Sequence, residues 1–396
     1  MIDWKVRIEN MHLETYDDVL ELHRNQKKIY ARFLSPHRVL STCRINGGLR
    51  EDIKVVLNHQ SCEPCNHMDA HAKRIITEPQ AYLEQLCKPE GVDFKHCVCL
   101  GTAANMNYAA IHKKEFKDLW VLTIATGGVE TNAGRAGDPA SYYEKNGVSV
   151  HVDNSEKIPE PGTINIMIFI NKTLSHGSMA RAVVTATEAK TAVLQELAVN
   201  SRYSDGLATG TGTDQIAIAS RLTDKPELTS AGKHTKLGEL IGKTVKAAVG
   251  ETLGLQNGLT PERQRSVKIH LERFGADKNK MIKGICSHLD DDMSKLIQDN
   301  FESIDRDPMI VASVAALVHL RDKAAHGILP LTCMKEIYSS FGAQIAIAAS
   351  GAASGRVGKT KDYAKQLAGK LHALNSQAML ELIYHALALG FKDKWR

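Results

Sequence analysis

The pattern of apolar and polar positions divides the chain into a part that mixes strands with helices and a part that is all helical. Short apolar runs separated by polar loops predict strands at residues 38–45, 53–57, 97–101, 119–125, 163–170 and 207–220. Helical periodicity predicts intervening helices at about residues 78–86 and 177–199. Such alternation is typical of a mixed β-sheet flanked by helices.

From about residue 261 onward the pattern predicts one helix after another. Alanine-rich runs at residues 311–318 and 343–353 favour helix–helix packing. The sequence Gly-Leu-Thr-Pro at residues 258–261 marks the change, and 396 residues exceed what one core usually organises. We therefore predict an α+β protein in which a domain of sheet and helices (residues 1–258) precedes an all-helical C-terminal domain of unknown role (residues 259–396).

Composition and charge narrow the class of protein. The chain is 43% hydrophobic and 24% charged, which is typical of a soluble globular protein. Its net charge of +5 is spread along the sequence, so no nucleic-acid-binding face stands out. The first residues lack an apolar signal core, and no run reaches about 18 apolar residues. We expect a cytoplasmic protein without nucleic acid or membrane partners, and the oligomeric state stays open.

Six of the eight cysteines fall in the first hundred residues. Without a secretion signal they are expected to be thiols, not disulfides. Spacing typical of metal ligands runs through His59, Cys62, Cys65, His67 and His71. A closed zinc site usually draws a second ligand pair from elsewhere in the chain, whereas this cluster is all local. A polar surface loop is the alternative, and we expect no metal.

The most informative segment is residues 208–214, Ala-Thr-Gly-Thr-Gly-Thr-Asp. Its glycines let the backbone approach a bulky group, its threonines supply donors and acceptors, and Asp214 can move a proton. Gly/Thr turns also simply reverse chains. The segment therefore indicates either a site or a turn.

Two further polar features lie close to predicted strands. Apart from Thr163 at its start, the run 163–170 has Asn165 as its one polar residue, so the Asn165 amide needs a partner, either a ligand or the adjacent loop. Residues 125–138 form a glycine-rich polar loop directly after a strand, without the Gly-x-Gly-x-x-Gly spacing of a dinucleotide site. Periodicity alone places Glu188 and Lys190 on the solvated face of the following helix.

Six segments, taken in order, resemble the motif series of the adenosylcobinamide amidohydrolases. They are residues 40–48 (Leu-Ser-Thr-Cys-Arg-Ile-Asn-Gly-Gly), 58–60 (Asn-His-Gln), 131–137 (Thr-Asn-Ala-Gly-Arg-Ala-Gly), 162–165 (Gly-Thr-Ile-Asn), 186–190 (Ala-Thr-Glu-Ala-Lys) and 208–214. That family cleaves the amide between the aminopropanol arm and the corrin ring, giving adenosylcobyric acid and 1-amino-2-propanol. The resemblance implies this hydrolysis in cobamide precursor salvage, with a corrinoid as substrate and no required cofactor.

Under this resemblance we assign roles as hypotheses. Hydrolysis of an amide needs an attacking oxygen, oxyanion stabilisation and a proton for the departing amine. Asp214 or Glu188 would move the proton, and the attacking oxygen would be an activated water or a threonine. The expected catalytic residues are Asn132 and Asn165 as oxyanion donors, Glu188, Lys190 as an activator, Thr211 and Asp214. The expected substrate-binding residues are Asn46, Gly47, Gly48, Thr131, Thr163, Thr209, Gly210, Gly212 and Thr213.

Two alternatives remain open. Residues 353–360 (Ala-Ser-Gly-Arg-Val-Gly-Lys-Thr) match a relaxed phosphate-loop pattern, but only 36 residues follow, so a basic turn between helices is the ordinary explanation. The protein could also be a non-catalytic corrinoid-binding or scaffold protein. Because no Asp-x-His-x-x-Gly signature occurs, we expect the corrin to be held by shape and by hydrogen bonds to its amide side chains.

Overall fold

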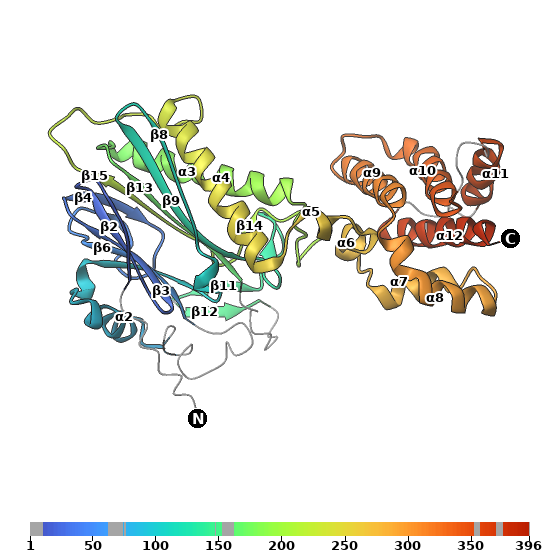
Figure 1. The fold of residues 1–396 in the computed structure, drawn as a ribbon, viewed down its shortest axis with the longest axis horizontal. Helices are drawn as coiled ribbons and strands as arrows, with labels where there is room; N and C mark the ends of the chain where they lie inside the picture. Colours follow the sequence, from blue (N-terminus) through green and yellow to red (C-terminus); the bar gives the residue numbers. More distant parts are fainter. Residues whose placement is uncertain are drawn as a thin grey trace. The chain divides into compact units, whose positions relative to one another are not determined.

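The computed structural model describes residues 11–61, 74, 77–146, 148–152, 162–351, 357–369 and 375–395. The chain forms two compact units (Figure 1). Unit 1 ends at Gly258 and unit 2 begins at Leu259. Gly258 takes the left-handed conformation that ends helix α4, which suits a residue without a side chain.

Unit 1 contains two large β-sheets. Sheet A has the order β1-β2-β3-β6-β7 and sheet B the order β5-β4-β15-β13-β9-β8. The strands of sheet A are β1 (Met11–Tyr16), β2 (Leu20–Asn25), β3 (Lys28–Phe33), β6 (Val55–Gln60) and β7 (Cys97–Thr102). Those of sheet B are β5 (Gly48–Arg50), β4 (His37–Ser41), β15 (Gln215–Arg221), β13 (Thr163–Ile170), β9 (Leu119–Gly128) and β8 (Ala110–Phe116). Strand β6 pairs parallel with β7, and β13 pairs parallel with β15.

The two sheets and two helices make three layers. Met167 and Phe169 of β13 share one buried core with residues of sheet A such as Leu22 and Val98. The other face of sheet B is covered by α3 (His176–Glu196) and α4 (Lys236–Asn257) (Figure 1). All eight residues of β13 are buried, which confirms the prediction of a central strand.

The connections of β13 bring distant segments to one edge of sheet B, which we call the amino edge. Strands β13 and β15 begin there, and β9, which runs antiparallel to β13, ends there. A short ladder of β10 (Ala133–Gly134) with β14 (Gly210–Thr211) joins the loops beyond these strand ends. The amino edge therefore gathers the polar segments around residues 127–134, 162–165 and 208–215.

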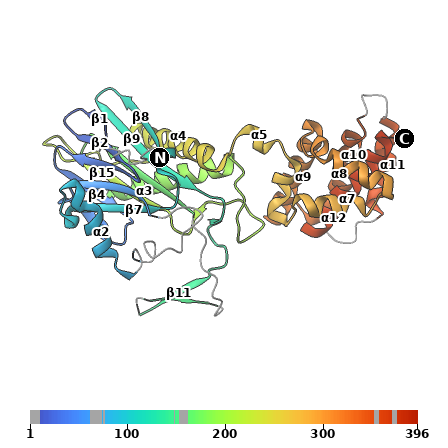
Figure 2. The same cartoon turned by 60° about the horizontal axis from the view of Figure 1, so that its bottom comes forward.

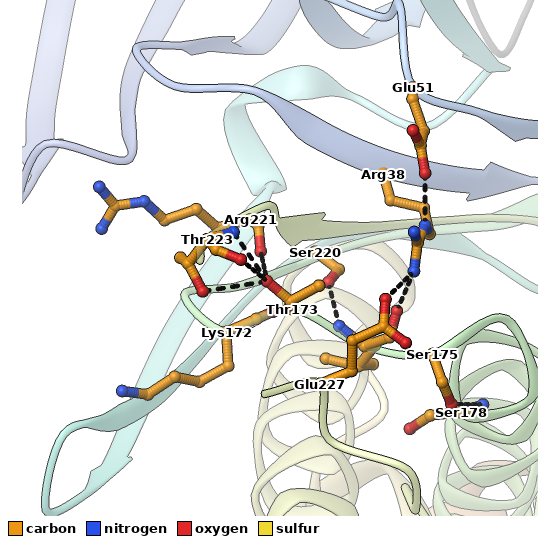
Figure 3. A network of polar contacts seen from close by, with 11 residues as sticks. Arg38, Glu51, Lys172, Thr173, Ser175, Ser178, Ser220, Arg221, Thr223 and Glu227 are labelled. Carbon is orange, nitrogen blue, oxygen red and sulfur yellow. Dashed lines mark hydrogen bonds and ion pairs between the residues drawn. The ribbon is translucent and has the colours of Figure 1, made fainter. Parts of the chain in front are cut away.

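The opposite edge, which we call the carboxyl edge, is tied together by the network in Figure 3. The guanidinium of Arg38 donates to the Leu174 carbonyl (2.5 Å) and to the carboxylates of Glu51 (2.7 Å) and Glu227 (2.9 Å). In the same network, Thr173 Oγ1 donates to the Arg221 carbonyl at 2.9 Å. These bonds fasten β4 to the start of α3 and to the chain that follows β15.

Smaller elements complete unit 1. Helix α2 (Pro79–Cys87) packs Leu83 and Cys87 onto the outer face of sheet A. A hairpin of β11 (Tyr142–Lys145) and β12 (Val148–His151) follows the β10 ladder, and Figure 2 shows β11 apart from the two sheets. The 3₁₀ turns are η1 (Lys88–Glu90), η2 (Phe94–His96) and η3 (Met106–Tyr108).

Unit 2 is helical and has its own apolar core. Its helices are α5 (Pro261–Gln264), α6 (Val267–Leu271), α7 (Lys278–Cys286), α8 (Asp291–Asp305), α9 (Pro308–Ala325), α10 (Met334–Ala349), α11 (Val357–Ala368) and α12 (Ser376–Lys394), with the 3₁₀ turns η4 (Glu272–Phe274) and η5 (Leu331–Cys333). Small residues let α10 and α12 pack closely, since a Cβ on Gly390 would lie 2.1 Å from the Ala346 carbonyl oxygen. Within the described ranges, no helix is long and apolar enough to cross a membrane.

The α+β class with a helical C-terminal region is confirmed. Strands β1–β3 and β8 and the hairpin were not predicted from the sequence, because their segments contain many polar residues and lack a clear apolar run. Of the phosphate-loop pattern at residues 353–360, the last four residues form the start of α11, and residues 353–356 lie outside the described residues.

Candidate active site

The carboxylate of Asp214 is the centre of a polar cluster at the amino edge. Its Oδ1 accepts hydrogen bonds from the Ile164 backbone N–H (2.9 Å) and from Thr211 Oγ1 (2.6 Å). Its Oδ2 accepts from the Thr211 backbone N–H (3.0 Å) and forms an ion pair with Lys190 Nζ. Four donors thus fix the carboxylate and aim the Thr211 hydroxyl at it.

Lys190 reaches Asp214 from helix α3. The side chains of the pair are only 8% and 11% exposed, so two opposite charges lie almost out of water. Gly210 makes this possible, because a Cβ there would lie 2.5 Å from Asp214 Oδ2 and 2.7 Å from Lys190 Nζ. The periodicity argument that placed Lys190 on a solvated face is therefore wrong, since the residue is buried.

A second chain of bonds joins the turn to the loops beside it. Thr213 Oγ1 lies 2.5 Å from Thr163 Oγ1 and donates to the Gly162 carbonyl at 2.6 Å. The same carbonyl accepts from Asn132 Nδ2 at 3.0 Å. Asn132 Oδ1 in turn accepts from the Tyr203 hydroxyl at 2.7 Å. Asn132 Nδ2 thus uses one of its two N–H groups in this chain of bonds.

A third group of amides lies on the face of β13 toward sheet A. Asn165 Nδ2 donates to Asn58 Oδ1 (2.9 Å) and to the Gly101 carbonyl (3.0 Å). Asn58 Nδ2 donates to Thr126 Oγ1 at 2.8 Å. Both N–H groups of Asn165 are therefore occupied, and this conformation leaves none for an oxyanion.

The remaining threonines and glycines of the segment occupy defined places. Thr209 Oγ1 accepts from the Ala136 backbone N–H at 2.8 Å, which fastens the turn to the glycine-rich loop. Gly212 is exposed at the tip of the turn. Thr131 is half-buried beside Asn132. These residues lie around the Asp214 cluster.

Glu188 is not part of this cluster. Two helical positions separate it from Lys190, which directs the two side chains to opposite sides of α3. Glu188 is exposed and pairs with Lys233 at 2.7 Å. The hydrogen bond from Lys233 lowers the pKa of the Glu188 carboxyl. The carboxylate that we expected to be catalytic therefore forms a surface ion pair away from the cluster.

The segment 46–48 also lies apart in its contacts. Asn46 Nδ2 donates to the carbonyls of Phe94 (2.7 Å) and Cys97 (2.8 Å), at the far end of β7 from Gly101. A Cβ on Gly47 would lie 1.9 Å from the Cys43 carbonyl oxygen, so the tight turn into β5 requires glycine. Gly48 opens that strand. These contacts hold the turn itself.

Of the five residues with the spacing of metal ligands, only His59 is described. Its Nδ1 lies 2.6 Å from the Tyr82 hydroxyl. Cys62, Cys65, His67 and His71 lie outside the described residues. Elsewhere in the described chain, no three His, Cys, Asp or Glu side chains are grouped to hold a metal ion.

Sequence reasoning missed several residues of the site. Gln215, whose Oε1 accepts from the Gly101 backbone N–H at 3.0 Å, is a polar residue at the start of an apolar strand, and that position was a usable signal. Tyr203 lies in the polar loop before the Gly/Thr turn, and only the fold places its hydroxyl on Asn132. Asn58 belongs to the motif at residues 58–60, but no role was assigned to it from the sequence.

The arrangement combines a hydroxyl bonded to a carboxylate, a nearly buried lysine and amides around a backbone turn, which are groups that can take part in nucleophilic and proton-transfer chemistry. In a comparison with known sequences, the profile of one family, described as adenosylcobinamide amidohydrolase, matches residues 13–261. The chain belongs to the adenosylcobinamide amidohydrolase family.

Two individual proteins are similar to parts of the chain. The uncharacterised protein MJ1613 of Methanocaldococcus jannaschii is 35% identical over 257 residues, which is 64% of this chain and 94% of that protein. The crystal structure of the PH0078 protein from Pyrococcus horikoshii OT3 overlaps 62% of this chain and 83% of its own, at 11% identity and a TM-score of 0.30, too slight a likeness to define the fold.

Proposed function

We propose that unit 1 hydrolyses the amide joining the aminopropanol arm to the corrin ring of adenosylcobinamide, giving adenosylcobyric acid and 1-amino-2-propanol. Family membership supports the reaction class. The observation that carries the proposal is the Asp214 carboxylate, held beside the nearly buried Lys190 with the hydroxyl of Thr211 bonded to it.

In the proposed reaction the Thr211 oxygen attacks the amide carbonyl while its proton passes to Asp214, to which it is already hydrogen-bonded. The oxyanion is stabilised by the second N–H of Asn132. Asp214 then returns the proton to the departing aminopropanol nitrogen. Water hydrolyses the resulting threonyl ester, which releases the acid and restores the hydroxyl.

Lys190 has a supporting role in this scheme. Its ammonium neutralises Asp214 when the carboxylate is charged and keeps it oriented toward Thr211. Glu188 has no part in it, because its carboxylate is on the opposite side of α3. Thr163, Thr213 and the exposed turn would contact the substrate around the scissile bond. The scheme requires no cofactor.

Incubation with adenosylcobinamide followed by mass spectrometry tests the proposal. We expect time-dependent release of both products by the full chain and essentially none by Asp214→Asn. A threonyl ester trapped by acid quenching would identify Thr211 as the attacking group, whereas turnover without such an ester would assign the attack to water. Saturable corrinoid binding without product would instead favour the non-catalytic binding protein.

A further inference from the structure

At the amino edge, the side-chain amides of Asn165 and Gln215 each have one polar atom without a hydrogen-bond partner among the described residues. Asn165 is fully buried, and its Oδ1 has no hydrogen-bond partner among the described residues. Gln215 is half-buried, and the one hydrogen bond of its amide in the described structure is accepted by Oε1, which leaves Nε2 open. A buried acceptor without a donor lowers stability, so an unmet group at this place points to a ligand.

The peptide group of Gly101 fixes the orientation of both amides. Its carbonyl can only accept, so the Asn165 atom that faces it is the NH₂ group; its N–H can only donate, so the Gln215 atom that faces it is oxygen. The open atoms are therefore assigned by chemistry: an acceptor on Asn165 and a donor on Gln215.

The two open atoms lie on neighbouring strands. Asn165 and Gln215 are directly paired in the parallel register of β13 and β15, about 4.8 Å apart, and both side chains face sheet A. One acceptor beside one donor is the complement of a carboxamide, whose N–H donates and whose C=O accepts. Asp214 bonds Lys190 of α3, on the helix-covered side, whereas the described hydrogen bonds of the Asn165 and Gln215 side-chain amides go to neither residue of that ion pair.

We propose that Asn165 and Gln215 together bind one peripheral carboxamide of the substrate, with its N–H donating to Asn165 Oδ1 and its C=O accepting from Gln215 Nε2. This inference rests on the proposed function, since it takes the ligand to be a corrinoid that carries carboxamide side chains. The pair determines substrate specificity and takes no part in bond cleavage. It distinguishes an amide from an acid or an ester at that position.

The test measures dissociation constants by the change in corrin absorption, for cobinamide and for the corrin heptamethyl ester, which lacks the amide N–H groups. Gln215→Glu keeps the oxygen that accepts from Gly101 and removes the open donor. Gln256→Glu is the matched control, because Gln256 Oε1 likewise accepts from a backbone N–H, that of Asn105 (2.9 Å).

We expect the wild-type chain to prefer cobinamide over the ester by at least about tenfold, the effect of one neutral hydrogen bond. Gln215→Glu should raise the dissociation constant and KM for cobinamide about tenfold and leave kcat near the wild-type value. The dissociation constant of the ester should rise with it, because both ligands offer a carbonyl to Gln215 Nε2 and only the N–H bond to Asn165 distinguishes them. Gln256→Glu should change none of these quantities. Gln215→Met, which lacks both donor and charge, should reproduce the loss of affinity.

An unchanged cobinamide affinity in both Gln215 variants would overturn the carboxamide assignment. Product release is followed in the same samples, so that the proposed hydrolysis and the carboxamide assignment are tested independently. Wild-type turnover with an unchanged cobinamide affinity in Gln215→Glu contradicts the carboxamide assignment alone. No turnover by the wild-type chain contradicts the proposed hydrolysis, while the binding ratios still decide what Asn165 and Gln215 recognise.

Discussion

The two edges of sheet B differ in how their polar groups are used. In open α/β sheets ligands usually bind beyond the carboxyl ends of the parallel strands. Here that edge is fastened by Arg38, whose guanidinium makes three contacts that join separate segments. The motif segments around residues 131–134, 162–165 and 208–214 lie at the amino edge, where the antiparallel strand β9 ends. The direction of a single pair of strands is thus a poor guide to the site in a mixed sheet.

The largest effect is expected at the centre of the amino edge. Asp214→Asn should lower kcat at least about a hundredfold, because the proton acceptor is lost. It should also destabilise unit 1 by about 3–5 kcal/mol, since Lys190 then lacks its counter-charge. Turnover assays and urea unfolding measure the two effects. Adding Lys190→Met should restore stability without restoring activity, and wild-type turnover in Asp214→Asn would remove this residue from the mechanism.

The hydroxyl of Thr211 gives the next largest effect. Thr211→Ala should lower kcat about a hundredfold, whereas Thr211→Ser should stay within about tenfold of wild type, because serine keeps the hydroxyl. Thr173→Ala at the carboxyl edge removes a comparably bonded hydroxyl and is the matched control. Equal losses in Thr211→Ala and Thr173→Ala would show that both positions act only through folding.

The carboxyl edge should instead affect stability, and with a specific pH dependence. Burial lowers the pKa of His37 to about 4, since its ring is fully enclosed against Phe33. The unfolded chain, with a pKa near 6.5, binds the proton more readily, so the stability present above about pH 6.5 declines as the pH falls toward 4. Between pH 7.5 and pH 5 this loss should be about 2 kcal/mol.

Urea unfolding at the two pH values measures the decline, and kcat should not follow it. His37→Gln should flatten the dependence, because glutamine does not titrate. A slope as steep in His37→Gln as in wild type would assign the acid sensitivity to other groups.

A smaller effect on stability is expected from the Arg38 contacts. Arg38→Met removes its hydrogen bonds to Leu174, Glu51 and Glu227 and should cost about 1–3 kcal/mol, seen as a melting temperature several degrees lower. The kcat of the folded variant should equal that of wild type. A hundredfold fall in kcat would mean that the carboxyl edge also serves the reaction.

The smallest effect is expected at Glu188, which belongs to neither edge. Glu188→Gln breaks only an exposed pair with Lys233, so the unfolding midpoint in urea should stay close to that of wild type. Turnover should stay within about twofold of wild type. A large loss of kcat with normal folding would show that the Glu188 carboxylate takes part in the reaction.

The sequence predicted the central strand, the helical C-terminal region and the Gly/Thr turn well, because local patterns determine them. Strand β13 is apolar at six of eight positions, and a run of this length and composition is typical of a buried strand. Lys190 could not be predicted in the same way. A lysine beside Glu188 on a helix indicates solvent exposure until a distant glycine and aspartate are known to face it.

The roles of the two asparagines show a similar limit. A buried amide predicts that Asn165 has partners, but which of its atoms they occupy depends on Gly101 and Asn58 in the other sheet. The pairing of sheet A with sheet B is a tertiary property without a local signature. Composition and motifs therefore identified the residues, and only the packing of the sheets assigned their contacts.

The closeness of Gly210 to the ion pair has a consequence for mutational tolerance. Any side chain at position 210 would displace the Asp214 carboxylate and the Lys190 ammonium from their present positions, so even alanine should lower activity there. Two positions later, a Cβ on Gly212 would have its nearest neighbour, Asn132 Oδ1, at 3.9 Å, which is ordinary van der Waals contact. When both codons are randomised, functional clones should keep glycine at position 210 and accept other residues at position 212. The two glycines of one short turn therefore differ in their tolerance of substitution.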